Sequence, residues 1–135
     1  MAQIPTTMKA VLLDRQIDDP VASIEGLKIV DKPVPKPGRG QVLVKIEAAP
    51  CNPSDLMYMR GLYRIDKKPP TVPGFEGCGT VVASGGGLMA NFLKGKRVAC
   101  GGQADSDGTW AEYFLADAGF CLPLAKALSF DQGAT

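Results

Sequence analysis

The stretch that decides the fold is GRGQVLVKIEA, residues 38–48, followed closely by NPSDLMYMRG, residues 52–61. The glycines that open the first segment make a turn, and apolar and polar residues alternate in its latter part, as in a strand with one buried face. In the second segment Asn52 can cap a helix, Pro53 suits its first position and Gly61 can end it. The sequence therefore predicts a strand over 42–48 and then a short helix of about two turns.

Further short strands are expected on both sides of this pair. They cover residues 8–14, 27–30, 80–83, 96–100, 110–115 and 121–124. A proline series at 33, 35 and 37 ends the second of them, and the small residues that lead into 80–83 permit a bulge or a close backbone approach. The glycines at 85–87 and a polar run at 103–108 supply turns. Many short strands with one internal helix predict a mainly β fold, a partly open antiparallel barrel with short helices.

The composition excludes several kinds of site and partner. The 135 residues contain no histidine, which excludes Ser-His-Asp and Cys-His nucleophiles and zinc sites with imidazole ligands. A formal net charge of +1 is too small for the electrostatic footprint of a nucleic-acid binder, so the expected partners are small molecules or proteins. The sequence has neither a signal-peptide pattern nor an apolar run of membrane length, so no membrane partner is expected.

The cysteines indicate a reducing environment. Cys51, Cys78, Cys100 and Cys121 form no C-x-x-C pair and are best interpreted as buried free thiols. A chain with unpaired thiols fits the cytoplasm.

Two further motifs bear on the organisation of the chain. The segment GGGLMA, residues 85–90, has the outline of a dinucleotide-binding fingerprint, but Gly95 follows too soon for the helix of several turns that such a site needs. We therefore interpret it as a turn. The segment SFDQ, residues 129–132, has the spacing of a capping box, and either begins a helix or belongs to a frayed terminus.

Polar groups gather around the predicted helix and the loop after it. Asn52, Asp55 and Tyr63 supply an amide, a carboxylate and a phenol that can face a cleft. Alternatively, Asn52 only caps the helix, Asp55 favours the positive end of its dipole, and Tyr63 is a packed loop aromatic. The basic residues of this region either attract phosphates of a cofactor or coenzyme A ester or form a solvated loop; they are Arg60, Arg64, Lys67 and Lys68. Trp110 and Tyr113, three apart on one predicted strand, should point to opposite faces.

Six stretches together resemble the amino-terminal half of a medium-chain dehydrogenase/reductase. They are MKAV (8–11), GQVLVK (40–45), NPSD (52–55), PGFEG (73–77), GKRV (95–98) and GTWAEY (108–113). The resemblance implies a GroES-like catalytic domain over residues 1–128. It also implies that residues 129–135 begin a helix leading to a Rossmann domain that is absent from this sequence.

Within this superfamily the sequence looks like the zinc-free branch of NADPH:quinone reductases and enoyl-thioester reductases. Zinc alcohol dehydrogenases carry a cysteine where Asn52 stands and a histidine where Phe75 stands, so the resemblance implies no metal. It implies hydride transfer from NADPH to a quinone or an activated alkene. Asn52 and Asp55 match positions that line the nicotinamide side of the cleft. Tyr63 matches a tyrosine that contacts the cofactor and acts as a catalytic hydrogen-bond or proton donor.

Without a Rossmann domain, we expect these 135 residues to bind NADPH weakly and to have no useful reductase activity. Two alternatives remain open. One is a GroES-like module that binds small molecules or associates into a homo-oligomer without catalysis. The other is a structural β-barrel subunit without a ligand.

Overall fold

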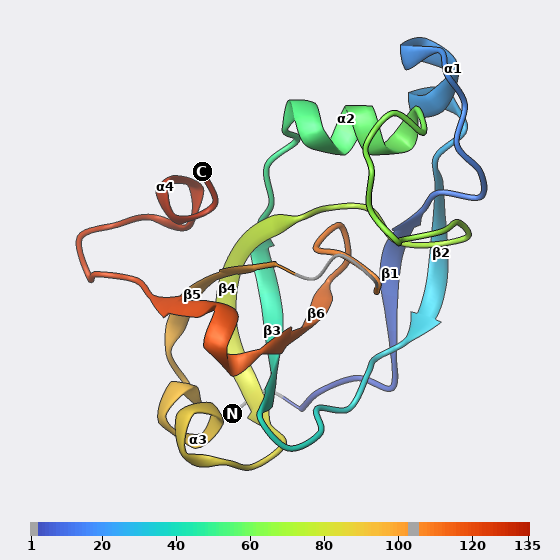
Figure 1. The fold of residues 1–135 in the computed structure, drawn as a ribbon. Helices are drawn as coiled ribbons and strands as arrows, with labels where there is room; N and C mark the ends of the chain where they lie inside the picture. The colour runs from blue at the N-terminus through green and yellow to red at the C-terminus, as the bar shows by residue number, and fades with distance from the viewer. Residues whose placement is uncertain (1–2, 103–105) are drawn as a thin grey trace.

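A five-stranded antiparallel sheet forms the centre of the molecule, with its strands in the order β6-β3-β4-β5-β7 (Figure 1). The computed structural model describes residues 3–102 and 106–135. The sheet comprises β3 (Gln41–Ala48), β4 (Glu76–Ser84), β5 (Arg97–Gly101), β6 (Tyr113–Asp117) and β7 (Cys121–Pro123), and a separate ribbon comprises β1 (Thr7–Leu12) and β2 (Lys28–Pro33). The predicted mainly β fold is confirmed. Residues 103–105 of the expected polar turn lie outside the described part of the chain.

The pairing of β3 with β4 is irregular at two places. Their pairing shifts register between Leu43 and Val44 and again between Ile46 and Ala48. Such bulges increase the local twist of a sheet. At the second shift Gly79 approaches β3 so closely that a β-carbon on it would lie 1.9 Å from the carbonyl oxygen of Lys45. The expected close approach is confirmed, although β4 already begins at Glu76 and includes the small residues that lead to residue 80.

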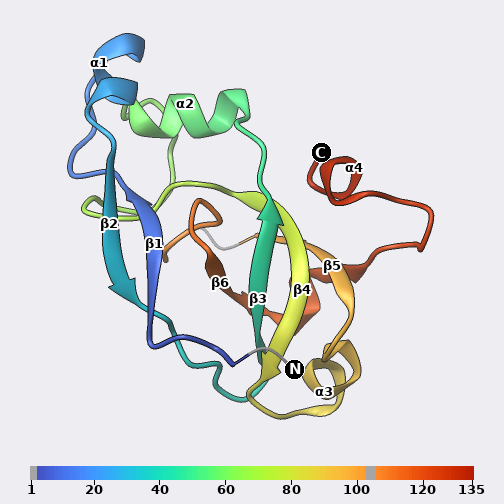
Figure 2. The ribbon, with the colours of Figure 1, turned by 180° about the vertical axis from the view of Figure 1, so that it is seen from behind.

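The β1–β2 ribbon closes part of the barrel by contacting the segment that precedes β6 (Figure 2). The Val11 N–H donates to the Trp110 carbonyl at 2.9 Å, and the Glu112 N–H donates to the Lys9 carbonyl at 3.1 Å. These bonds join a strand near the start of the chain to a loop about a hundred residues later. β2 extends to Pro33, three residues beyond the predicted end, because a proline is tolerated where a strand ends at an open edge.

Trp110 lies before β6 rather than on it, so the prediction that Trp110 and Tyr113 share a strand is wrong. The backbone N–H of Trp110 donates to the Pro73 carbonyl at 3.1 Å, and its indole N–H donates to the Pro50 carbonyl at 3.1 Å. These two bonds tie the tryptophan to loops on either side of it. The β3–β6 pairing begins only at Tyr113.

The described residues contain four short α-helices and one 3-10 turn. They are α1 (Pro20–Glu25), α2 (Pro53–Met59), α3 (Leu88–Leu93), η1 (Ala118–Phe120) and α4 (Phe130–Gly133). Helices α1 and α2 lie at one end of the barrel and α3 lies at the other (Figures 1 and 2). None of the helices in the described ranges is long and apolar enough to cross a membrane.

Helices α1 and α3 correct the expectation of one internal helix. At α1 the Asp19 carboxylate accepts the N–H of Ala22 at 2.8 Å, and Pro20 occupies the first turn. This Asp-Pro start is a recognisable signal, but six residues are too few to show helical periodicity. Helix α3 follows the glycine turn and is also six residues long, which agrees with rejecting the dinucleotide fingerprint.

Helix α4 is held against the sheet by side chains of β4 and β5. The Arg97 guanidinium lies 4.4 Å from the centre of the Phe130 ring and donates to the Leu128 carbonyl at 2.6 Å. The Cys78 thiol donates to the Phe130 carbonyl at 2.7 Å. The predicted capping box at the start of α4 is confirmed, because the Ser129 hydroxyl accepts the Gln132 N–H at 3.1 Å.

Two apolar clusters stabilise the fold. The larger combines side chains of all five strands of the central sheet with α3, and includes Val42, Val44, Val81, Leu93, Val98, Cys100, Phe114 and Cys121. The smaller lies under α2, where Leu13, Tyr58 and Met59 pack with Phe75 and Trp110. The smaller cluster therefore fixes α2 and the loop around Phe75 relative to each other.

Asp107 joins β2 to the loop that precedes β4. Its carboxylate accepts the Val72 N–H at 3.0 Å and the Thr71 hydroxyl at 3.3 Å, and it pairs with Lys32. Burial works to raise the pKa of Asp107, but the Lys32 ammonium and the hydrogen bonds outweigh it and lower the pKa below 3.8. Its contribution to stability is therefore present above pH 3.8 and is lost as the pH falls through the lower folded-state pKa.

The substitution Asp107→Asn tests this connection. We expect a loss of about 1 kcal/mol of unfolding free energy at neutral pH, a small value because the side chain is partly exposed and screened. The deficit should shrink as the pH is lowered below 3.8, since the native carboxylate is then protonated as well. Urea denaturation at neutral and acidic pH measures both effects. A deficit that does not change with pH contradicts the assignment.

Candidate functional site

Asp55 connects the start of α2 to the loop before β4. Its Oδ2 atom accepts the Asn52 N–H at 2.8 Å, and its Oδ1 atom accepts the Phe75 N–H at 3.2 Å. The side chain is buried, and burial raises the pKa of its carboxyl group although both backbone bonds act in the opposite direction. Asp55 thus holds two chain segments in place, with each oxygen engaged by a backbone donor.

Asn52 is the capping residue just before α2, as the sequence predicts, and its side chain reaches across to β4. The side-chain amide donates to the Glu76 carboxylate at 2.9 Å. Helix α2 ends before Gly61, whose φ of +77° a residue with a side chain rarely adopts. Asn52 and Asp55 therefore both contact the Phe75-Glu76 pair, one through Glu76 and the other through the Phe75 backbone.

Tyr63 lies in the loop after α2 and is 43% exposed. Its ring packs on Phe75 with the ring centres 5.4 Å apart and the planes tilted by 42°. Phe75 in turn meets Tyr58 edge to face, with the ring centres 5.8 Å apart. An aromatic row thus leads from the core to Tyr63, and it supports one face of an accessible phenol.

Tyr58 and Lys67 form the buried end of this row. The Tyr58 hydroxyl donates to the Lys67 carbonyl at 2.9 Å, and burial raises the pKa of Tyr58 to about 12. The Lys67 ammonium lies 5.6 Å from the Tyr58 ring centre and 5.7 Å from that of Phe75. Such contacts stabilise a cation over aromatic faces.

The structure does not bear out a basic patch made of the four cations of this region. Lys67 is 3% exposed and packs on the aromatic row. Arg60 forms an ion pair with Asp18 at 2.8 Å. Lys67 is thus buried, and Arg60 is paired with an acidic residue outside the loop. The sequence alone shows neither arrangement.

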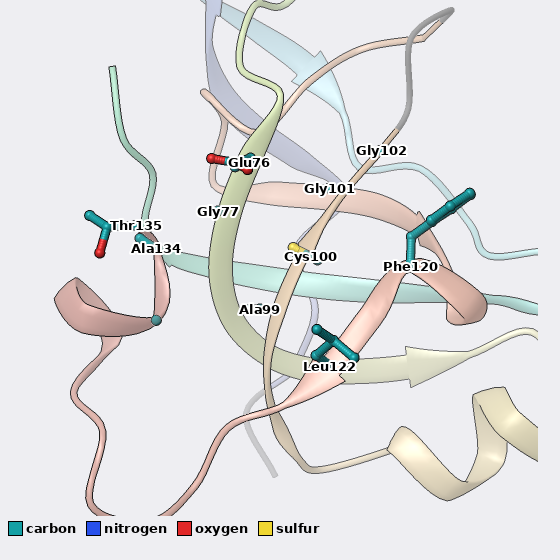
Figure 3. A pocket seen from close by; sticks show the side chains of 11 residues that line it. Glu76, Gly77, Ala99, Cys100, Gly101, Gly102, Phe120, Leu122, Ala134 and Thr135 are labelled. Atoms are coloured by element: carbon teal, nitrogen blue, oxygen red, sulfur yellow. The ribbon is translucent and has the colours of Figure 1, made fainter. Parts of the chain in front are cut away.

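A pocket of about 290 Å³ opens beside Glu76, between α4 and strands β4, β5 and β7 (Figure 3). Its lining includes Glu76, Cys100, Phe120, Leu122, Ala134 and Thr135. Asn52 reaches this pocket only through its bond to Glu76, and neither Asp55 nor Tyr63 lines it. Glu76 was not among the predicted site residues, although it stands in the PGFEG stretch that carries the resemblance.

The donor atoms near Asn52 do not suit a zinc ion. Phe75 offers no ligand atom, and the Asn52 amide already donates to Glu76. In the ranges that the structure describes, no group of three or more histidine, cysteine, aspartate or glutamate side chains is arranged to hold a metal.

Comparison with known proteins places this geometry in a family. The family model of the alcohol dehydrogenase GroES-like domain matches residues 38–126. An alcohol dehydrogenase of Rhizobium meliloti is 35% identical, in a match that covers 80% of this chain and 39% of that protein. A mitochondrial enoyl-[acyl-carrier-protein] reductase of Caenorhabditis elegans is 30% identical over 96% of this chain and 36% of its own length.

The fold agrees with a solved structure over nearly its whole length. A protein of Mesorhizobium loti, assigned as an NADPH:quinone reductase, superposes with a TM-score of 0.87 and 38% identity, covering 98% of this chain and 41% of that one. The chain thus spans about two fifths of the relatives that it matches. It belongs to the alcohol dehydrogenase GroES-like domain family, within the medium-chain dehydrogenase/reductase superfamily.

Proposed function

We propose that this chain forms the substrate side of an NADPH-dependent reductase that acts on quinones or on activated alkenes such as enones. The observation that carries the proposal is the accessible phenol of Tyr63, whose ring packs on Phe75, the residue before the Asn52 partner Glu76. The names of two relatives, an enoyl reductase and a quinone reductase, support this substrate class.

NADPH would supply the hydride in this reaction. Tyr63 donates a hydrogen bond or a proton to the oxygen of the substrate, or a hydrogen bond to the nicotinamide. Asn52 precedes α2, and the amide hydrogen that is not used in its bond to Glu76 is the nicotinamide contact. The predicted nicotinamide contact of Asp55 stays a prediction; its burial and its two backbone bonds favour placing α2 and Phe75 correctly.

The nucleotide itself would be held mostly by residues outside this sequence. Residues 1–128 form the GroES-like catalytic domain in this proposal, and 129–135 begin the helix that leads to a Rossmann domain. The poor zinc donor set at Asn52 and Phe75 supports a zinc-independent reaction. The four cysteines are free thiols, which fits a reducing compartment such as the cytoplasm.

Titration of the isotopically labelled chain by NMR tests the site. A soluble quinone is expected to shift amide signals near Asn52 and Tyr63, and Tyr63→Phe should weaken its affinity about fivefold through the loss of one hydrogen bond. Tyr113→Phe is the matched control, because Tyr113 lies on β6 and is expected to leave the affinity unchanged. Shifts elsewhere, or equal affinity of the Tyr63 variant, contradict the proposal.

A second titration tests whether NADPH binding and turnover depend on a Rossmann domain. NADPH alone is not expected to saturate the chain at about 1 mM, and mixtures of NADPH with quinones or enoyl-CoA esters should show no turnover above background. Clear turnover by the purified chain would refute the dependence on a Rossmann domain. It would leave the assignment of Tyr63 open to the same substitution test.

One observation favours the alternative of a self-associating module. Helix α3 exposes Leu88 (94%), Met89 and Phe92, and β7 exposes Leu122 (71%). Exposed apolar side chains of this size often mark contact surfaces. Sedimentation over a range of concentrations tests this alternative. A stable oligomer that the substitution Leu88→Gln dissociates supports a self-associating module. A monomer at all concentrations excludes it.

A further inference from the structure

Cys100 and Cys121 lie directly opposite each other in the sheet. Cys100 belongs to β5 and Cys121 to the edge strand β7, and the antiparallel register pairs the two residues. Directly opposite residues point to the same face, and both side chains are buried in the larger apolar cluster. The two sulfur atoms therefore share one side of the same two-stranded segment.

This placement suits a covalent bond between the thiols. Opposite residues of an antiparallel pair have Cα atoms about 4.5 to 5.5 Å apart, within the range that disulfides span. Their Cβ atoms are usually somewhat farther apart than in a relaxed disulfide, so β7 must move slightly toward β5. As a three-residue strand at the edge of the sheet, β7 is free of a neighbour on its other side in the described sheet.

The other two cysteines lie in different settings. Cys78 faces Ala99 in the β4–β5 register, and its thiol donates to the Phe130 carbonyl. Cys51 is exposed in the loop before α2, so the expectation of a buried thiol is wrong for this residue. Register thus singles out one pair among the four thiols.

Burial keeps both paired thiols protonated at neutral pH, so their reaction with a peroxide is slow and is favoured by alkaline pH. Burial raises the pKa of Cys121 to about 11 and raises that of Cys100 further, with the neighbouring Cys121 adding to the rise. A small neutral oxidant has a route to one member of the pair, because Cys100 lines the pocket beside Glu76 (Figure 3). Reaction between the two sulfurs then depends on their proximity rather than on exposure.

We propose that Cys100 and Cys121 form a reversible disulfide that ties β7 to β5 when a peroxide reaches the pocket. Peroxide oxidises one thiol to a sulfenic acid and releases water, and the second sulfur displaces the hydroxyl as a second water. The two sulfurs lose two electrons in total, which reduce the peroxide O–O bond. The bond would fix the strand that carries Leu122, a wall of the pocket, and a thiol reductant would reopen it.

The unmodified sequence offers a direct measurement. Trypsin releases residues 98–126 as one peptide that contains both cysteines, because no lysine or arginine stands between Arg97 and Lys126. The folded chain is treated with hydrogen peroxide at mildly alkaline pH, denatured, and alkylated with iodoacetamide. We expect this peptide to be lighter by two hydrogen atoms and free of alkylation. Cleavage at Glu112, the only glutamate within it, should give fragments that separate only after reduction.

Variants and an unfolded control decide between this pairing and non-specific oxidation. Cys51→Ser and Cys78→Ser should each leave the bridge intact, whereas Cys121→Ser should leave Cys100 alkylated or oxidised without a bridge. In urea the same treatment should give a mixture that includes Cys51 and Cys78 bridges. Alkylation of both thiols in the oxidised folded chain, a Cys78–Cys100 bridge, or the same mixture with and without urea would overturn the proposal.

Discussion

Replacing Gly79 by alanine is expected to cost about 3 kcal/mol or more of unfolding free energy. The added β-carbon would lie 1.9 Å from the Lys45 carbonyl oxygen and 2.7 Å from its carbonyl carbon. Both atoms belong to the backbone of β3, so no side-chain rotation relieves the overlap. Relief requires β3 and β4 to separate at the register shift beside Ile46.

Urea denaturation monitored by the fluorescence of Trp110 measures this loss. The midpoint should fall while the dependence on urea stays similar, because the surface exposed on unfolding changes little. Gly119→Ala is the matched control: nothing lies within 4 Å of its added β-carbon, and the expected change is within about 0.5 kcal/mol. If Gly79→Ala and Gly119→Ala proved equally stable, the close approach of β3 and β4 would be disproved.

Asp55→Ala is expected to produce the second large effect, a loss of about 3 kcal/mol. The substitution removes the acceptors of two backbone donors, the N–H groups of Asn52 and Phe75, at a buried position. Both ends of the candidate site should loosen together, so quinone-dependent shifts near Tyr63 should weaken as well. Asp31→Ala is a suitable control, since the ion pair that its side chain forms with Lys9 in the described part of the chain is exposed, and its loss should change the unfolding free energy little.

The pH dependence gives an independent check on Asp55. Burial raises its folded-state pKa above 3.8, so its contribution to stability is complete below that pH and declines as the pH rises through the folded-state value. Asp55→Asn keeps the shape but does not titrate. Its deficit relative to the native chain should therefore be larger at acidic pH than at neutral pH, opposite in sign to Asp107→Asn. A deficit that grows as the pH rises would show that the ionised form is the favoured one.

The parts of the fold that could be predicted are those in which local signals agree. Strand β3 follows a glycine turn and shows alternation, and α2 has a cap, a proline and a terminal glycine at the right places. Helices α1 and α3 were missed because six residues give too little periodicity. Trp110 was misplaced because its bonds to Pro50 and Pro73 are long-range contacts, which local propensity does not encode.

The candidate site divides in the same way. Asn52, Asp55 and Tyr63 could be selected because they stand in or near recognisable motifs. The aromatic row through Phe75 and Tyr58, and the burial of Lys67 beside it, arise only when α2 and the loop before β4 pack together. Glu76 gains its place beside the pocket from its position at the start of β4, which began earlier than the sequence suggested.

The contacts that hold α4 have a practical consequence for protein engineering. The Phe130 ring and carbonyl are bound by Arg97 and Cys78, which belong to the two neighbouring strands β4 and β5. A polypeptide fused after α4 would therefore leave the barrel in a direction that the sheet fixes, rather than through a flexible linker. Replacing Arg97 would give such a fused partner a wider range of orientations and would leave the interior of the barrel unchanged.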